Sequence, residues 1–434
     1  MTLKKIFIFC LLIFFSIQLS AQEYSKLVDT KIGSKGEGLA CGYNFIGATY
    51  PFGMVQFTPT FFSPQKGFVI TQLNGAGCSN LGNFPILPLT GMIEKSPYDM
   101  NSFEKYEKVE IAKAGYLSLK MNDNVDVDLT VTKRSGIGKF SFDNSNYGTL
   151  IIGTGINSSP SENIKDAFVK ITSDSSCEGY TRGGDFCGTE SDYEIYFAAE
   201  FDRPSIYNGT WKEKKLSTKK SNSGKNSGAY FTFDTNEIDK INYRIAISFV
   251  SIENAKENLK SENKHLTFEE HQRETSKEWD KYLSTIKIKS DNKDRIKQFY
   301  THFYHSLIHP NIISDVNGEY MGADFKVHKT KENREQYSSF SVWDTYRTQG
   351  QLIAMLFPKK SSDMMQSLVD FAEQAGGYGR WILANIETGI MQGDPTPILI
   401  SNSYAFGGDD FDLETAYRYM KKGALIPRLY SQKQ

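Results

Sequence analysis

The segment from Phe340 to Arg347 combines side chains that suit sugar recognition. Trp343 offers an indole that can stack on the C–H face of a pyranose ring. The adjacent Asp344 offers a carboxylate that can accept hydrogen bonds from two neighbouring hydroxyls. The alternative is structural: Trp343 is then a buried anchor and Asp344 caps a helix, because Asp favours helix N-termini. Arg347 is expected to pair with a carboxylate inside a helical layer rather than to touch a ligand.

Four further side chains join Trp343 and Asp344 as candidate substrate-binding residues. Arg380 and Trp381 follow the glycine-rich stretch that ends at Gly379. Glu387 and Asp394 come next along the chain, and Asp394, between a glycine and a proline, could equally hold a turn. No set of metal ligands can be named from the residues alone, and the spacing of His302, His305 and His309 fits an amphipathic helix better than a metal site.

Charge and composition narrow the class of protein. The 434 residues carry a formal charge of −1, and aromatic residues make up 13%. Removing Lys4 and Lys5 with a leader leaves 48 basic and 51 acidic residues, a charge of about −3. The chain therefore has no basic excess with which to hold phosphates, and a nucleic-acid partner is not expected.

Residues 1–21 have the three-part pattern of a secretory signal peptide. Lys4 and Lys5 precede an apolar run, and small residues end at Ala21. We expect cleavage after Ala21 and a periplasmic or secreted protein. The apolar run is short for a membrane anchor, and no later stretch is long and apolar enough to span a bilayer. Cys41, Cys78, Cys177 and Cys187 then remain, and their pairing stays open: Cys187 can bridge locally to Cys177 or reach Cys78.

The chain divides into a β half and an α half. Short runs of alternating or continuous apolar residues, separated by polar turns, predict a β-sandwich over residues 22–250. The predicted strands include 125–132, 148–153, 193–200 and 241–249. A charged segment without Gly or Pro, within residues 251–285, predicts a linking helix whose face is too polar for a core.

Residues 286–434 show helical periodicity. Apolar side chains recur from Ile296 to Leu307, from Met364 to Ala372, and from Leu413 to Met420. Pro310 and Gly376 are expected to end the first two helices, and Asp412 and Gly423 to bound the third.

Ordered motifs in both halves resemble glycoside hydrolase family 92, the exo-acting α-mannosidases. They include Gly47–Gln56, Asn74–Cys78, Phe84–Gly91, Phe197–Pro204, Ser341–Arg347, Arg380–Trp381, Gly393–Pro395 and Tyr404–Gly407. The resemblance implies an N-terminal β-sandwich followed by an (α/α)6 barrel. It also implies inverting hydrolysis of α-mannoside-containing glycans, in which one carboxyl group protonates the leaving oxygen and another activates water, and it implies a Ca2+ ion that binds sugar hydroxyls.

Two departures from the family pattern stand out. Gln72–Gly75 replaces a His-Leu-Ser-Gly stretch, and the segments that carry the family's general acid and base do not occur in the sequence. The ~150 residues of the α half also hold too few helices for a twelve-helix barrel. We therefore expect an incomplete barrel and a chain that is inactive alone. The alternatives are a non-catalytic carbohydrate-binding protein, a subunit of a larger assembly, and a different (α/α)6 enzyme using Glu387, Asp394 and Asp344.

Overall fold

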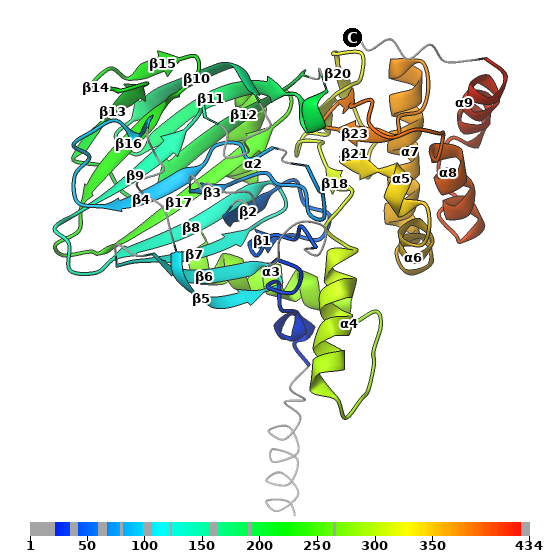
Figure 1. Cartoon of the computed structure of the whole chain (residues 1–434), viewed down its shortest axis with the longest axis horizontal. Coiled ribbons are helices and arrows are strands. Elements are labelled where there is room, and N and C mark those ends of the chain that lie inside the picture. The colour runs from blue at the N-terminus through cyan, green and yellow to red at the C-terminus, as the bar shows by residue number, and fades with distance from the viewer. Residues whose placement is uncertain are drawn as a thin grey trace, which may run out of the picture.

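A computed structural model describes residues 22–34, 42–59, 67–78, 81–98, 106–121, 124–156, 163–189, 192–263 and 266–426. Within these residues the N-terminal half forms two antiparallel sheets, and the helices α5–α9 lie on the opposite side of the molecule (Figure 1). The predicted order, a β-sandwich and then a helical domain, is confirmed. The predicted signal peptide and Cys41 lie outside the described residues.

The described part of the chain contains one eight-stranded and one nine-stranded sheet. The first has the order β1 (Ala48–Thr49), β2 (Gln56–Pro59), β3 (Phe68–Val69), β4 (Ile86–Thr90), β9 (Tyr147–Gly153), β16 (Ser227–Asp234), β13 (Tyr207–Lys212), β14 (Lys215–Ser217). The second has the order β15 (Ser221–Ser223), β10 (Asn163–Ser173), β11 (Ser176–Gly184), β12 (Asp192–Phe201), β17 (Lys240–Ser248), β8 (Ser135–Phe142), β7 (Val125–Val131), β6 (Tyr116–Met121), β5 (Tyr106–Lys113).

Alternation of side chains explains why these segments are strands. In β7, Val125, Val127 and Leu129 are fully buried, whereas Asp126 and Asp128 between them lie on the opposite face. Each such apolar side chain stabilises the fold by roughly 1.5–3 kcal/mol on burial. The same logic correctly placed β9, β12 and β17. Buried residues of both sheets and of the helical part join in one hydrophobic cluster, so the two halves share a core.

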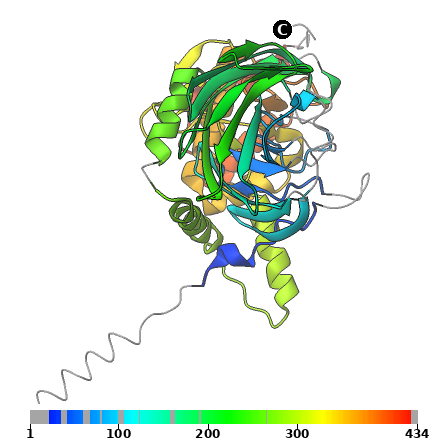
Figure 2. The same ribbon diagram turned by 90° about the vertical axis from the view of Figure 1, so that its left-hand side faces the viewer.

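The linking segment forms two helices rather than the single predicted one. α2 (Ile252–Asn263) and α3 (Phe268–Leu283) are distinct because Thr267 starts α3 with a capping box that includes Glu270. α2 lies on the outer side of the nine-stranded sheet (Figure 2). The polar character of α2 has a specific cause: its buried face carries Asn254, Asn258 and Asn263, which form hydrogen bonds.

The helical part begins with α4 (Lys293–His305) and continues with α5 (Val342–Thr345), α6 (Gln349–Leu356), α7 (Pro358–Ala375), α8 (Thr396–Ala405) and α9 (Leu413–Leu425). Short strands between them are β18 (Asn311–Ile312), β19 (Glu319–Met321), β20 (Val327–Lys329), β21 (Tyr337–Ser338), β22 (Phe340–Ser341), β23 (Trp381–Leu383) and β24 (Ile386–Glu387). The short helices η1 (Tyr24–Leu27) and η4 (Phe186–Gly188) belong to the N-terminal half.

Two of the four predicted helix boundaries are correct, whereas α4 ends at His305, ahead of the predicted Pro310. Asp412 accepts a hydrogen bond from the Thr415 amide and caps α9. Gly376 ends α7 with φ of 80°, a left-handed conformation that favours glycine. Gly423 does not end α9, which runs on to Leu425.

A buried carboxylate joins the two halves. Asp315 accepts hydrogen bonds from Ser248 at the end of β17 (2.7 Å) and from Asn254 (2.9 Å) and Asn258 (2.6 Å) of α2. Burial raises the pKa of Asp315, and these three donors oppose that rise. Because the carboxylate comes from the helical part and its donors from the sandwich and α2, this cluster fixes how the halves dock.

Candidate carbohydrate site

A small three-stranded sheet brings the sequence-predicted residues together. In it β22 pairs with β23, with Ser341 opposite Trp381, and β23 pairs with β24. The amide of Val342 also donates to the carbonyl of Arg380 (3.1 Å). Segments about forty residues apart in sequence are therefore neighbours. The backbone that leads into Trp343 and Asp344 lies next to the backbone of Arg380 and Trp381.

Trp343 and Asp344 lie on the one-turn helix α5, which starts where β22 ends. Asp344 is exposed and accepts a hydrogen bond from the Ser341 hydroxyl, while Trp343 is half-buried. Asp344 therefore lies inside the turn and does not cap it. A carboxylate oriented by one hydroxyl and otherwise open to solvent keeps lone pairs available for a ligand.

The prediction for Arg347 is wrong. Its guanidinium lies over the ring of Trp343 (5.2 Å to the centroid) and over the ring of Tyr346 (5.3 Å), on the exposed surface. Such cation–π contacts orient an indole without needing a carboxylate. Arg347 thus supports one side of Trp343, which sequence spacing did not reveal because the partner is an aromatic face.

Glu387 binds the backbone of its own hairpin. Its carboxylate accepts from the amides of Arg380 (2.6 Å), Trp381 (3.4 Å) and Gly389 (3.0 Å). Burial raises the pKa of Glu387, and the hydrogen bonds from these amides act in the opposite direction. This geometry makes Glu387 a group that positions Arg380 and Trp381.

Arg380 and Trp381 are both buried. Nη2 of Arg380 donates to the carbonyl of Gly389 (3.2 Å). The Trp381 ring packs on Phe186 of the N-terminal half, with centroids 5.2 Å apart, and its buried Nε1 has no hydrogen-bond acceptor within the described structure. The Trp381 ring therefore packs inside the protein and supports the cluster from within.

The N-terminal half reaches this cluster through a disulfide-linked loop. Cys187 follows Phe186 and is bonded to Cys78, whereas Cys177 is buried and free. Of the two pairings proposed for Cys187, the one with Cys78 is thus correct and the local one wrong. Phe186 was not predicted as a site residue, because the residue pattern around it looks like that of an ordinary core residue. The neighbouring Cys187 is the one sequence feature that points to this loop.

The loop that contains Asn74 also contacts the helical part. The backbone amide of Asn74 donates to Nε2 of His309 (3.0 Å). Burial lowers the pKa of His309 to about 4. The neutral imidazole can therefore accept this bond at physiological pH. The Asn74–Cys78 motif is in this way tied to the helical part at one end and to Cys187 at the other.

Asp394 lies in the loop between β24 and α8 and is exposed. Two residues later, the Thr396 hydroxyl donates to the carbonyl of Gly379 (2.5 Å). That bond holds the start of α8 beside the Gly379–Arg380 turn. Asp394 consequently belongs to the rim of the cluster and not to its buried part.

The side chains in the described structure do not make a calcium site. Calcium takes six to eight oxygen ligands, and among the described residues no group of three or more His, Cys, Asp or Glu could hold a metal. Glu387 is occupied by backbone amides, which leaves Asp344 and the peripheral Asp394 as the carboxylates of this cluster. No chemical step is therefore assigned to a metal.

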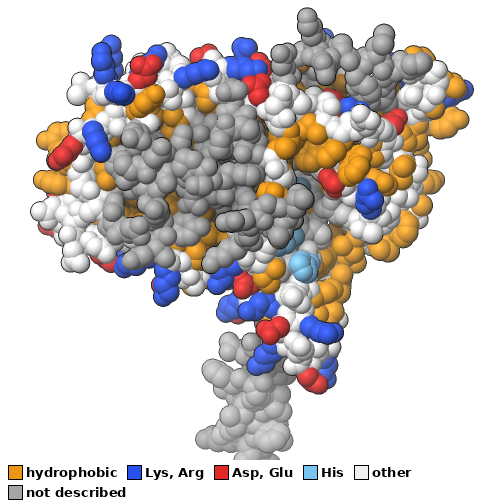
Figure 3. All heavy atoms as spheres, viewed as in Figure 1, with side chains coloured by type: hydrophobic (Ala, Val, Ile, Leu, Met, Phe, Trp, Pro, Cys, Tyr) orange, Lys and Arg blue, Asp and Glu red, His pale blue; other side chains and the backbone are white. Residues whose placement is uncertain are grey.

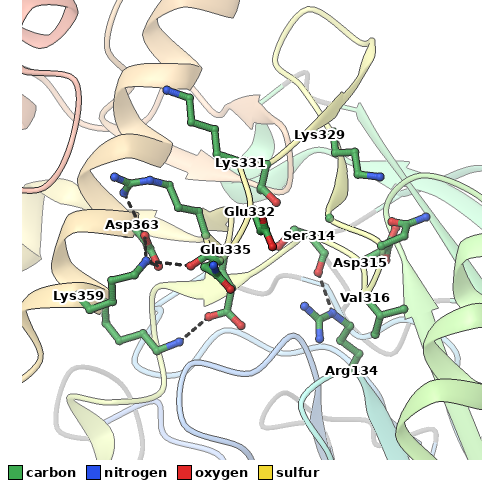
Figure 4. A pocket seen from close by; sticks show the side chains of 16 residues that line it. Arg134, Ser314, Asp315, Val316, Lys329, Lys331, Glu332, Glu335, Lys359 and Asp363 are labelled. Atoms are coloured by element: carbon green, nitrogen blue, oxygen red, sulfur yellow. Dashed lines mark hydrogen bonds and ion pairs between the residues drawn. The ribbon is translucent and has the colours of Figure 1, made fainter.

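A cavity lined by described residues lies elsewhere, between the two halves. It has a volume of about 570 Å3 and is lined by charged side chains, among them Arg134, Glu335 and Asp363 (Figure 4). Lys133 and Lys360 both contact Glu335, and Arg334 and Lys359 both contact Asp363. Because most of these charges pair with one another, we interpret the cavity wall as a contact that holds the two halves together and not as a ligand site.

Glu335 gives this junction a testable dependence on pH. Although burial acts to raise it, Lys360 and Lys133 hold the pKa of Glu335 well below its ordinary value of 4.5. The folded-state pKa is thus lower than the unfolded one, so the stabilisation is present above pH 4.5 and is lost as pH falls below it.

We expect Glu335→Gln to lower the free energy of unfolding by about 2 kcal/mol at neutral pH, because it weakens two charged hydrogen bonds. The difference from wild type should shrink near pH ~3.5. Urea denaturation at both pH values measures it, and an undiminished difference at the lower pH would contradict the assigned ion pairs.

Comparison with known proteins agrees with this architecture. The model of the glycosyl hydrolase family 92 N-terminal domain matches residues 27–248, and that of the family 92 catalytic domain matches residues 254–434. A family GH92 α-mannosidase of Bacteroides thetaiotaomicron has a TM-score of 0.85 at 25% identity, covering 94% of this chain and 57% of that chain. An inverting GH92 mannosidase of the same organism has a TM-score of 0.83 at 21% identity and shares the fold, with 94% and 56% covered.

A curated relative, an uncharacterized secreted glycosidase of Arthroderma benhamiae, is 23% identical over 366 residues, which are 75% of this chain and 46% of the relative. The chain thus spans about half the length of the relatives it matches. Because the two family models together cover most of the sequence, the chain belongs to glycosyl hydrolase family 92.

Proposed function

We propose that this chain recognises a terminal α-mannosyl residue as part of a family 92 α-mannosidase. The observation that carries the proposal is the pairing of β22 with β23, which places the start of α5, with Trp343 and Asp344, next to the backbone of Arg380 and Trp381. Support comes from the matches to both family domain models and from the likeness to a structure of a GH92 α-mannosidase.

The side chains suggest separate roles. Trp343, backed by Arg347, stacks on the C–H face of the sugar, and Asp344 accepts from two adjacent hydroxyls. Trp381 packs beneath this surface, and Glu387 keeps the Arg380–Trp381 backbone in place. The exposed Asp394 lies at the edge of the sugar site, where its carboxylate can accept a hydrogen bond from the sugar. Burial of an aromatic face together with directed hydrogen bonds is what gives a concave site its specificity.

We further propose that hydrolysis, with inversion at the anomeric carbon, depends on a general acid and base from a polypeptide segment outside these 434 residues, and that any calcium ligands come with it. The helical part offers a surface for such a segment. Tyr417 and Leu425 of α9 are 67% and 69% exposed, and Ile398 and Tyr404 of α8 are about half exposed. Hydrophobic side chains gather on this part of the molecule in Figure 3.

A second function is a carbohydrate-binding subunit whose apolar helical face is covered by a partner. Monomers rarely expose large contiguous apolar patches. This favours a cover over the helical face, either by a further segment of the same polypeptide or by a partner protein. The two functions share the sugar site and differ in whether mannose is released.

Export remains part of the proposal. The leader pattern at residues 1–21 and the curated relative's description as secreted support it. In the part of the chain that the structure describes, no helix has the length and apolarity needed to cross a membrane.

Ligand-observed NMR with methyl α-mannoside tests the sugar site directly. Trp343→Ala and Asp344→Ala should each weaken binding at least about tenfold, because truncating a central anchor costs about 2 kcal/mol. Tyr207→Ala, an exposed aromatic on β13, is the matched control and should bind like wild type. Wild-type affinity in both site variants, or equal binding of methyl α-glucoside, would refute the proposed site.

A further inference from the structure

Three aromatic side chains form a row on the outer face of the nine-stranded sheet. Phe168 on β10 is opposite Tyr180 on β11, and Tyr180 is opposite Tyr196 on β12. Along β12 the alternate residues Ile195 and Phe197 are buried in the core, so Tyr196 points to the outside. The row therefore crosses three neighbouring strands at one level.

The rings form a continuous strip. The centroids of Phe168 and Tyr180 are 6.1 Å apart with planes inclined by 29°, and those of Tyr180 and Tyr196 are 6.0 Å apart with planes inclined by 50°. All three side chains are half-buried. Cross-strand packing of this kind stabilises a sheet, but it leaves part of each ring accessible to solvent.

Helix α2 packs on the row of sheet residues next to the rings. Ala255 and Leu259 of α2 pack on Ala198 and Ala246, and Lys256 of α2 pairs with Glu178. Ala198 and Glu178 lie two positions along β12 and β11 from Tyr196 and Tyr180, and Ala246 of β17 is opposite Ala198. The small side chains of Ala198 and Ala246 allow α2 to pack closely on the sheet at this row.

Polar groups border the row on its other side. The Tyr180 hydroxyl donates to Asp166 (2.8 Å), and the Tyr196 hydroxyl donates to Glu194. Arg182 pairs with Asp192, which also binds Lys165. The hydroxyls are thereby held in place, and each carboxylate keeps lone pairs for further donors.

We propose that this aromatic row is a second carbohydrate-binding surface, which holds the chain of a neutral glycan against the β-sandwich. Ring faces with adjacent carboxylate and guanidinium groups match the C–H faces and hydroxyls of successive sugars. The cations Arg182 and Lys165 pair with Asp192 and Asp185, and Asp166 and Glu194 add two further carboxylates, so this border has no positive excess for an anionic polymer. The choice of an α-mannan as the glycan rests on the proposed function.

Affinity electrophoresis of the chain in gels containing soluble α-mannan tests the proposal. The double variant Tyr180→Ala/Tyr196→Ala should bind mannan at least about tenfold more weakly, since two stacking faces are removed. Tyr180→Phe/Tyr196→Phe keeps the rings and should retain most of the affinity. Tyr207→Ala, on the other sheet, should behave like wild type.

Trp343→Ala separates this surface from the sugar site. It should weaken binding of methyl α-mannoside at least about tenfold, while mannan retardation persists through the aromatic row. Wild-type mannan affinity in the double alanine variant, loss of retardation in Trp343→Ala, or no retardation of wild type would each overturn the proposal. If the double variant melts early, Tyr180→Ser alone replaces it, with the same expected direction.

Discussion

Purified residues 22–434 should release mannose from an aryl α-mannoside at least about 10⁴-fold more slowly than a fusion that appends the C-terminal segment of a family 92 relative. General acid and general base catalysis each contribute roughly 10²–10⁴-fold, and the proposed function places both groups outside this chain. In the fusion, Asp344→Ala should lower kcat/KM again, because the carboxylate then orients the sugar for attack by water.

The comparison needs two controls. Tyr207→Ala in the fusion should leave turnover unchanged, and binding of methyl α-mannoside by the unfused chain shows that its sugar site is folded. Comparable turnover by the two proteins would contradict the proposal of a missing acid and base. The search would then move to Glu387 and Asp394, the carboxyl groups of the alternative enzyme hypothesis.

Asp315→Ala should lower the free energy of unfolding by about 3 kcal/mol. Three buried donors, on Ser248, Asn254 and Asn258, lose their shared acceptor, and an unsatisfied buried polar group costs about 1–3 kcal/mol. Because these donors come from the sandwich and α2, we also expect faster proteolytic cleavage between the halves.

Urea denaturation measures the first effect and limited trypsin digestion the second. Asp291→Ala is the matched control, since Asp291 is exposed and surface substitutions usually change stability by less than about 0.5 kcal/mol. Equal stability of Asp315→Ala and wild type would show that the cluster does not hold the halves together.

Sequence patterns predicted the strands well because their signal is local. β7 and β17 alternate between core and surface, and this alternation is visible in the residue order alone. The segment between the halves was harder. Its charge and lack of Gly and Pro indicated one helix, whereas the Thr267–Glu270 capping box divides it in two.

The candidate site was only partly predictable. Trp343, Asp344, Arg380 and Trp381 were chosen for their chemistry, and the pairing of β22 with β23 that unites them depends on contacts forty residues apart in the chain. The stacking of Arg347 on Trp343 likewise depends on side-chain direction. No local pattern reports such contacts.

Other features are invisible in sequence because each element contributes one residue. The aromatic row takes one ring from each of three strands, and each ring alone is an ordinary strand residue. The contact of Phe186 with Trp381 joins the two halves in the same way. Register and packing, rather than composition, create these clusters.

A crystal structure of the chain soaked with methyl α-mannoside tests the central claim most directly. We predict electron density for a pyranose ring stacked on Trp343, with two of its hydroxyls within hydrogen-bond distance of Asp344. Density for the sugar only at other places on the molecule, with the Trp343–Asp344 cluster empty at saturating ligand, would contradict the account.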